Sequence, residues 1–229
     1  SNINKTVKMK NLVLLLTLTF VITALYAQDK SAKDYKIEAA DAYKAKDFAK
    51  GLASFEKAIE MYEAEDKIDT TLYFNAAICA IKEKDYQKSI SYFDRSIELD
   101  YKVCKSTFYK ANAIKGMDDG DKLIEVCEAG IEKCPKYKSK FNEMLFAHYL
   151  KAGLDIFNNA AKMQADATPL ASTDADQYKA EMEKVKAEFN KSLPMLEKAH
   201  EIDPADENCN KALKQAYEIL DMPAKAASL

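Results

Sequence analysis

The amino-acid sequence predicts an all-α fold in which antiparallel helical hairpins follow one another along the chain. Three observations lead to this prediction. The 229 residues include only 5 Gly and 5 Pro, so few tight turns and few β-hairpins are available. Segments of 34 residues resemble one another, and within each of them large apolar residues recur at helical spacing. A single helical hairpin cannot bury its own apolar face, so such segments are stable only when they stack.

The first 27 residues have the pattern of a secretory signal peptide. Lys5, Lys8 and Lys10 precede an apolar run over residues 12–27, and no acidic residue comes before the end of that run. The run of 16 residues is short for a bilayer-spanning helix, which needs about 20. We therefore expect cleavage after Ala27 and a periplasmic or secreted location, with an uncleaved membrane anchor as the alternative. Loss of three Lys would take the formal net charge from −3 to −6.

Three repeats follow, at residues 32–65, 70–103 and 104–137. The first two align without gaps, so that Tyr35 and Tyr73 stand at the same position of the first helix. In each repeat, small residues fall where two helices would approach closely. A break with Asp, Gly or Lys near the middle separates the first helix from the second.

The fourth repeat, residues 138–206, contains an insertion of about 35 residues. Apolar positions continue at helical spacing on both sides of it, which predicts that both helices are lengthened into a protruding hairpin. The tip, residues 164–176, is rich in Ala, Thr and Asp, and Thr173 or Asp174 is placed to cap the returning helix. A last helix over residues 207–220 would cover the exposed end of the stack.

Two stretches carry a resemblance to a known family. Residues 85–100 (DYQKSISYFDRSIELD) and residues 191–204 (KSLPMLEKAHEIDP) resemble the second helix of the tetratricopeptide repeat, with its small residue, its aromatic or Leu, and its closing Asp. The resemblance covers most of residues 32–220. It implies one domain over residues 28–229, folded as a right-handed α-α superhelix of tetratricopeptide-type helical hairpins. Together with the signal peptide, it implies a non-catalytic scaffold of a bacterial cell envelope that binds a protein or peptide.

No motif for catalysis, cofactor binding or metal binding is recognisable. His148 and His200 lack a Cys or carboxylate partner at metal-ligand spacing, and there is no nucleophile elbow, phosphate loop, zinc motif or calcium loop. Arg95 is the only arginine and the pI is about 5.6, so nucleic acid is not an expected partner. We expect no cofactor and no small-molecule substrate, and contact with a membrane only if the signal peptide is retained. The remaining alternative is an enzyme whose site is assembled across helices.

The chain has five cysteines, an odd number, so at least one thiol is unpaired within the chain. Cys79 and Cys127 occupy apolar helix positions, so we expect each of them to act as a small buried apolar side chain. Cys104 opens the first helix of the third repeat and Cys134 closes its second helix, so an antiparallel pair would bring them near each other. Any intramolecular disulfide is expected here, and two free thiols are the alternative.

The resemblance also places a binding surface, because first helices line the concave groove of the family. Five Lys alternate with aromatic residues at these positions, which locally reverses the sign of charge on an acidic protein. The aromatic residues are expected to be exposed, so that burying them requires a ligand. We expect a general peptide-binding groove here; solvated Lys side chains and a partner surface on the protruding hairpin near residues 150–185 are the alternatives. The groove positions are Lys33, Lys36, Tyr43, Lys44, Phe74, Asn75, Ile78, Lys82, Lys105, Phe108, Tyr109 and Asn112.

Overall fold

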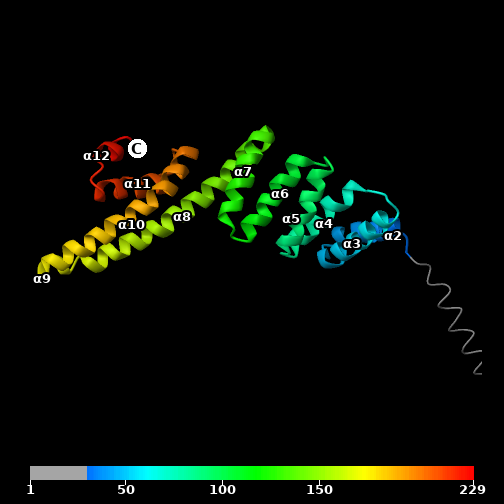
Figure 1. Ribbon diagram of the computed structural model, residues 1–229, viewed down its shortest axis with the longest axis horizontal. Helices are drawn as coiled ribbons and strands as arrows, with labels where there is room; N and C mark the ends of the chain where they lie inside the picture. Colours follow the sequence, from blue (N-terminus) through cyan, green and yellow to red (C-terminus); the bar gives the residue numbers. More distant parts are fainter. Residues whose placement is uncertain (1–29) are drawn as a thin grey trace, which may run out of the picture. The chain divides into compact units, whose positions relative to one another are not determined.

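The computed structural model describes residues 30–229 (Figure 1). The predicted signal peptide, residues 1–27, lies outside the described residues. Helices and no strand occur in the described part of the chain, which confirms the all-α class of consecutive helical hairpins. The chain divides into two compact units, the first ending at Glu83 and the second running from Lys84 to Leu229.

The division between the units falls inside the second predicted repeat, between its two helices. The first unit holds α2 (Ala32–Lys44), α3 (Phe48–Ala64) and α4 (Thr70–Lys82). The second unit holds α5 (Tyr86–Glu98), α6 (Val103–Gly116), α7 (Gly120–Lys133), the 3-10 turn η1 (Pro135–Tyr137), α8 (Lys138–Ala167), α9 (Leu170–Thr173), α10 (Ala175–Ile202), α11 (Glu207–Ile219) and α12 (Pro223–Ala227). Each of the first three predicted repeats therefore contains two α-helices, and the fourth contains α8 and α10 with the short α9 between them.

The turns within the first three hairpins share one local conformation. A non-glycine residue takes the left-handed conformation, and the Asp that follows it caps the second helix through its side chain. The left-handed residues are Lys46 (φ 62°), Lys84 (φ 62°) and Asp118 (φ 57°), followed by the caps Asp47, Asp85 and Asp119. The left-handed conformation costs a residue with a Cβ about 1–2 kcal/mol.

Small residues allow the close helix contacts of the second unit. Ser96 on α5 and Ser106 on α6 are fully buried, and their hydroxyl oxygens lie 3.1 Å apart. The Ser96 hydroxyl also donates to the Tyr101 carbonyl oxygen at 2.9 Å, so burial leaves it with a partner. Gly130 on α7 lies against the ring of Phe141 on α8, which is fully buried.

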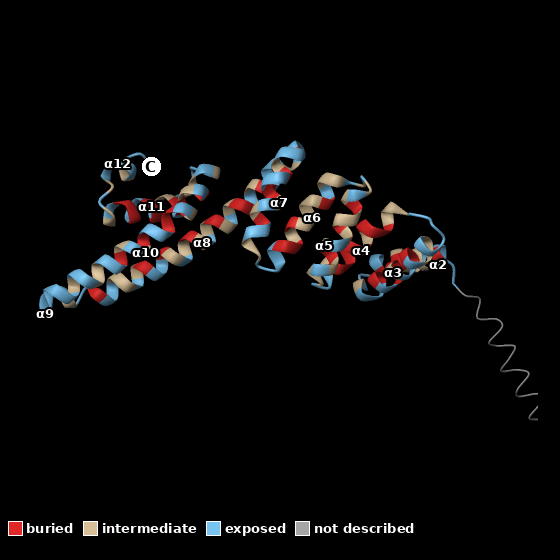
Figure 2. Cartoon of the chain, in the orientation of Figure 1, coloured by how far each residue is buried: buried red, intermediate tan, exposed pale blue. Residues whose placement is uncertain are grey.

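The lengthened helices of the fourth repeat are confirmed. Helices α8 and α10 contain 30 and 28 residues and lie antiparallel (Figure 1). Buried positions recur along α8 and, from Val185 onward, along α10 (Figure 2). The rings of Phe157 and Phe189 meet at 5.2 Å between centroids. At the tip, the Asp174 side chain accepts a hydrogen bond from the Gln177 backbone amide at 3.0 Å and caps α10. Asp174 is one of the two residues predicted to cap this helix.

The predicted last helix is also present, as α11. Its Tyr217 is buried, and the Tyr217 hydroxyl donates to Glu197 of α10 at 2.7 Å. The Lys225 ammonium of α12 donates to the same carboxylate oxygen at 2.7 Å. Burial opposes ionisation of Glu197, but the hydrogen bonds from Lys225 and Tyr217 outweigh burial and hold the pKa of this carboxyl below its usual value. Glu197 thus joins α10, α11 and α12.

Candidate functional site

On α2, in the first unit, the predicted groove positions are Lys33, Lys36, Tyr43 and Lys44. Tyr43 is 42% exposed. Lys36 forms an ion pair with Asp69, the residue that caps α4, and Lys44 pairs with Asp41 at 3.1 Å. These two lysines therefore have carboxylate partners within their own unit, and Tyr43 remains accessible as predicted.

On α4, the expectation of an exposed aromatic residue is wrong for Phe74. The Phe74 side chain is 5% exposed, so it requires no ligand to be buried, and the groove position Ile78 is buried as well, at 9%. The reason is that α4 is apolar on nearly all sides, with 8 of its 13 residues buried. Asn75 is half-buried and Lys82 is exposed, and their role in binding stays a prediction.

On α6, in the second unit, the aromatic groove residues are half-buried by the fold itself. The ring of Phe108 lies 5.7 Å from the ring of Tyr137, and the ring of Tyr109 stacks on Phe93 at 5.9 Å. The Asn112 side-chain amide donates to the carbonyl oxygen of Phe108 at 2.9 Å. The expectation that only a ligand would bury these rings is therefore wrong, although each keeps part of its surface exposed.

Two lysines lie over these rings. The Lys140 ammonium of α8 is 5.1 Å from the centroids of both Phe108 and Tyr137, and the Lys105 ammonium of α6 is 6.0 Å from the Tyr109 ring. These are cation–π distances. We call Lys105, Phe108, Tyr109, Tyr137 and Lys140 the basic aromatic patch. Tyr137 and Lys140 were not predicted from the sequence, because Tyr137 lies in the connection between repeats and Lys140 stands at a position that the register does not assign to the groove.

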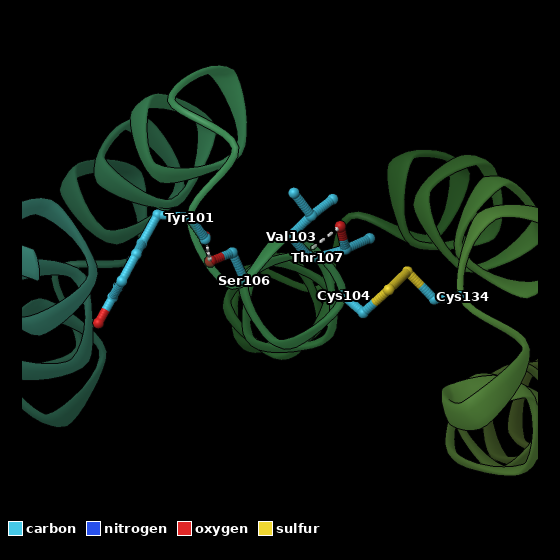
Figure 3. The surroundings of a disulfide bond; sticks show 6 residues. All are labelled: Tyr101, Val103, Cys104, Ser106, Thr107 and Cys134. Carbon is cyan, nitrogen blue, oxygen red and sulfur yellow. Dashed lines mark hydrogen bonds between the residues drawn. A yellow bond between two sulfur atoms is a disulfide. The ribbon is translucent and has the colours of Figure 1, made fainter. Parts of the chain in front are cut away.

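A disulfide closes the third hairpin beside the patch. Cys104 and Cys134, the pair that the sequence singles out, are bonded with 5.5 Å between their Cα atoms. Figure 3 shows Cys104 at the start of α6 and Cys134 at the end of the neighbouring helix. Phe108 follows Cys104 by one helical turn and Tyr137 follows Cys134 by three residues. The bond thus ties together the two chain segments that carry the patch.

A pocket of about 570 Å³ continues the site along α8. Four of its lining residues stand 34 residues after Lys105, Phe108, Tyr109 and Asn112, at the same positions of the next first helix. These four are Ser139, Asn142, Glu143 and Phe146, and Lys138, Ile202 and Asp203 complete the lining. The predicted groove ends at the third repeat, and the same 34-residue period carried one repeat further identifies these four residues.

The free cysteine thiols and the two histidines are packed into the helical fold rather than grouped in a reactive site. Burial raises the pKa of the Cys127 thiol to about 12 and those of the Cys79 and Cys209 thiols to about 11, so these thiols are weak nucleophiles. The His148 ring lies against Gly120, and His200 shares a hydrogen bond with an Asn side chain at 2.7 Å. Within residues 30–229, no three His, Cys, Asp or Glu side chains are grouped to hold a metal ion.

None of the helices in the described part of the chain is long and apolar enough to cross a membrane. The long helices of the hairpin, α8 and α10, carry charged residues throughout their length.

Comparisons with known proteins find similar structures but no similar sequence family. No protein-family model and no curated protein matches the chain. A TPR repeats protein from Bacteroides fragilis is 20% identical over 82% of this chain and 99% of its own, with a TM-score of 0.46. MamA from Desulfovibrio magneticus is 15% identical over 88% of this chain and 92% of its own, with a TM-score of 0.47. YrrB, described as a TPR protein with an unusual peptide-binding site, is 14% identical over 83% of this chain and 96% of its own, with a TM-score of 0.42.

Proposed function

We propose that this protein is an exported helical-repeat scaffold that binds a segment of another protein and catalyses no reaction. The binding surface is formed by the basic aromatic patch and the pocket on α8, which share the first turn of that helix. The observation that carries the proposal is the pocket of about 570 Å³, whose lining repeats the groove positions of α6 after one sequence period. Its mixture of Phe146 and Ile202 with amide, hydroxyl and charged groups suits an extended peptide with both apolar and polar side chains.

Capture of partners from an envelope extract tests this surface. Phe146→Glu places a charge in the pocket, and Leu170→Glu places the same charge at a half-buried position on the hairpin tip. We expect Phe146→Glu to lose a partner that the unchanged protein and Leu170→Glu both retain, with circular dichroism showing equal helicity. The reverse pattern, in which Leu170→Glu loses the partner, would move recognition to the hairpin.

Export is tested separately. The proposal is supported by the basic and apolar pattern of residues 1–27. Mass spectrometry of the protein from the native envelope fraction should give a chain that begins at Gln28. A mass that includes the apolar run would instead favour an anchored assembly factor.

A further inference from the structure

We propose that the partner segment is acidic, and that its carboxylates are received by Lys140 of the basic aromatic patch and by the neighbouring Lys136 and Lys138. This inference rests on the proposed scaffold function and adds the chemistry of the partner. It begins from the distribution of charge. Residues 101–117 and 133–142 contain no Asp or Glu, although the whole chain has a net charge of −3. Their eight lysines are Lys102, Lys105, Lys110, Lys115, Lys133, Lys136, Lys138 and Lys140.

The disulfide holds these two basic segments together. Cys104 lies in the first segment and Cys134 in the second. Like charges brought close repel one another, and the repulsion grows as salt is removed. A covalent link keeps the segments adjacent despite this repulsion, and a negatively charged partner would relieve it. The two basic segments are therefore electrostatically complementary to an acidic segment, whereas the pocket beside them also holds Glu143 and Asp203.

The lysines of the second segment are available to such a partner. Among the described residues, no carboxylate forms a salt bridge with Lys136, Lys138 or Lys140, and all three are exposed. By contrast, Lys110 in the first segment pairs with Asp94 at 2.6 Å. The Lys140 side chain is also held in one place, because its ammonium group lies over the rings of Phe108 and Tyr137. A lysine held in this way loses less side-chain freedom when it binds a carboxylate.

The N-terminal ends of α6 and α8 also favour an acidic partner. Helices α6 and α8 begin in the two basic segments with no side-chain cap and with no acidic residue in the first turn. Helices α5, α7, α10 and α11 of the same unit each begin with an Asp cap. Carboxylates near the first turns of α6 and α8 would interact favourably with the amide groups there.

An acidic polypeptide suits this surface better than a nucleic acid does. Single-stranded nucleic acids bind through bases stacked on open aromatic faces. The Phe108 ring already contacts Tyr109, Tyr137 and Phe141 in addition to Lys140, at ring distances of 5.5, 5.7 and 6.2 Å. The patch also lacks arginine, whose planar fork matches phosphate oxygens better than an ammonium group does.

Binding of a defined peptide tests the inference. The probe is a fluorescent peptide in which Glu alternates with Leu, and its control is the same peptide with Gln in place of every Glu. Fluorescence anisotropy with the whole protein should show the Glu peptide binding at least about tenfold more tightly than the Gln peptide, with the difference shrinking as salt is added. Equal binding of the two peptides would overturn the inference.

Three variants locate the binding. Lys140→Glu and Lys136→Glu reverse charges in the second basic segment, and Lys162→Glu makes the same change at an exposed position on the distal part of α8. The first two should weaken Glu-peptide binding about tenfold or more, and Lys162→Glu should change it less than about twofold. A similar loss in all three variants would show only an effect of net charge and would refute the site. Both Lys140→Glu and Lys136→Glu are made so that the test still holds if one of the two substitutions disturbs the fold. Only a variant whose helicity by circular dichroism equals that of the unchanged protein is counted.

A further probe and the capture experiment separate the remaining outcomes. A single-stranded DNA oligonucleotide that bound more tightly than the Glu peptide would overturn the assignment to an acidic polypeptide. If the Glu peptide fails to bind while Phe146→Glu still abolishes partner capture, the scaffold function stands and the acidic preference falls. If Phe146→Glu has no effect on capture either, both fall.

Discussion

Replacing Gly130 by Ala should destabilise the protein, although the same change in most helix interiors is stabilising. Gly130 is a buried residue of α7. A Cβ added there would lie 2.5 Å from Cζ, 2.6 Å from Cε2 and 2.9 Å from Cε1 of the Phe141 ring. The ring is fully buried and has the rings of Phe108 and Tyr137 as neighbours at 6.2 and 6.4 Å. It therefore cannot move away without disturbing the packing between α6 and α8.

Two opposing effects set the magnitude. Ala is favoured over Gly within a helix by about 1 kcal/mol. Overpacking a filled core costs about 1–3 kcal/mol, and a contact with three ring atoms at once belongs at the upper end of that range. The difference is a net loss of about 2 kcal/mol in the free energy of unfolding.

Urea denaturation followed by circular dichroism measures this loss. The control is Ala129→Gly at the exposed neighbouring position, which should cost about 1 kcal/mol through helix propensity alone. In a Phe141→Leu background, the cost of Gly130→Ala should shrink, because a smaller side chain leaves room for the added methyl group. A Gly130→Ala protein more stable than the parent would refute the reasoning, since it would mean that α7 and α8 separate freely.

Three further changes have expected outcomes. Replacing Cys104 and Cys134 together by Ser should lower the free energy of unfolding by about 3.5 kcal/mol, because a ring of about 30 residues is opened; an unchanged urea midpoint would contradict this. Lys84→Gly should raise the free energy of unfolding by about 0.5–1 kcal/mol, because Gly adopts the left-handed conformation without strain, and a lower midpoint would show that the turn is not left-handed. Since the folded-state pKa of Glu197 lies below 4.5, the stability it contributes is present above that pH and is lost as the pH falls through the lower folded value. Tyr217→Phe should reduce this pH dependence in acid denaturation curves, and an identical curve would remove Glu197 as its source.

The sequence predicts the helices and hairpins well because their signals are local and repeated. The 34-residue period places the turns, where an Asp such as Asp85 caps the second helix. The same register places Cys104 at the start of the first helix and Cys134 at the end of the second, which is the same end of an antiparallel pair, without any knowledge of the packing around them. Apolar spacing on both sides of the insertion is sufficient to predict that the two helices of the fourth repeat are elongated.

The burial of individual groove residues could not be predicted in the same way. Register indicates that Phe74 and Phe108 share a face with the groove, but burial depends on which other side chains fill the space around each ring. Phe74 lies in a helix that is apolar on nearly all sides, and Phe108 contacts Tyr137 from the connection between repeats. Lys140 was missed for a related reason, because its side chain reaches the neighbouring first helix rather than the groove position on its own helix.

The long hairpin can change in length only by coordinated steps in its two helices. Each residue inserted into a helix rotates everything beyond it by about 100°, so one extra residue in α8 would turn the side chains beyond it away from α10. Insertions of about seven residues nearly restore the facing surface, and a matching insertion in α10 would be needed to give the new turns a partner. Homologues with shorter or longer hairpins should therefore differ by similar numbers of residues before and after the tip. The position of Asp174 as the cap of the returning helix would move outward with it, unchanged in its local surroundings.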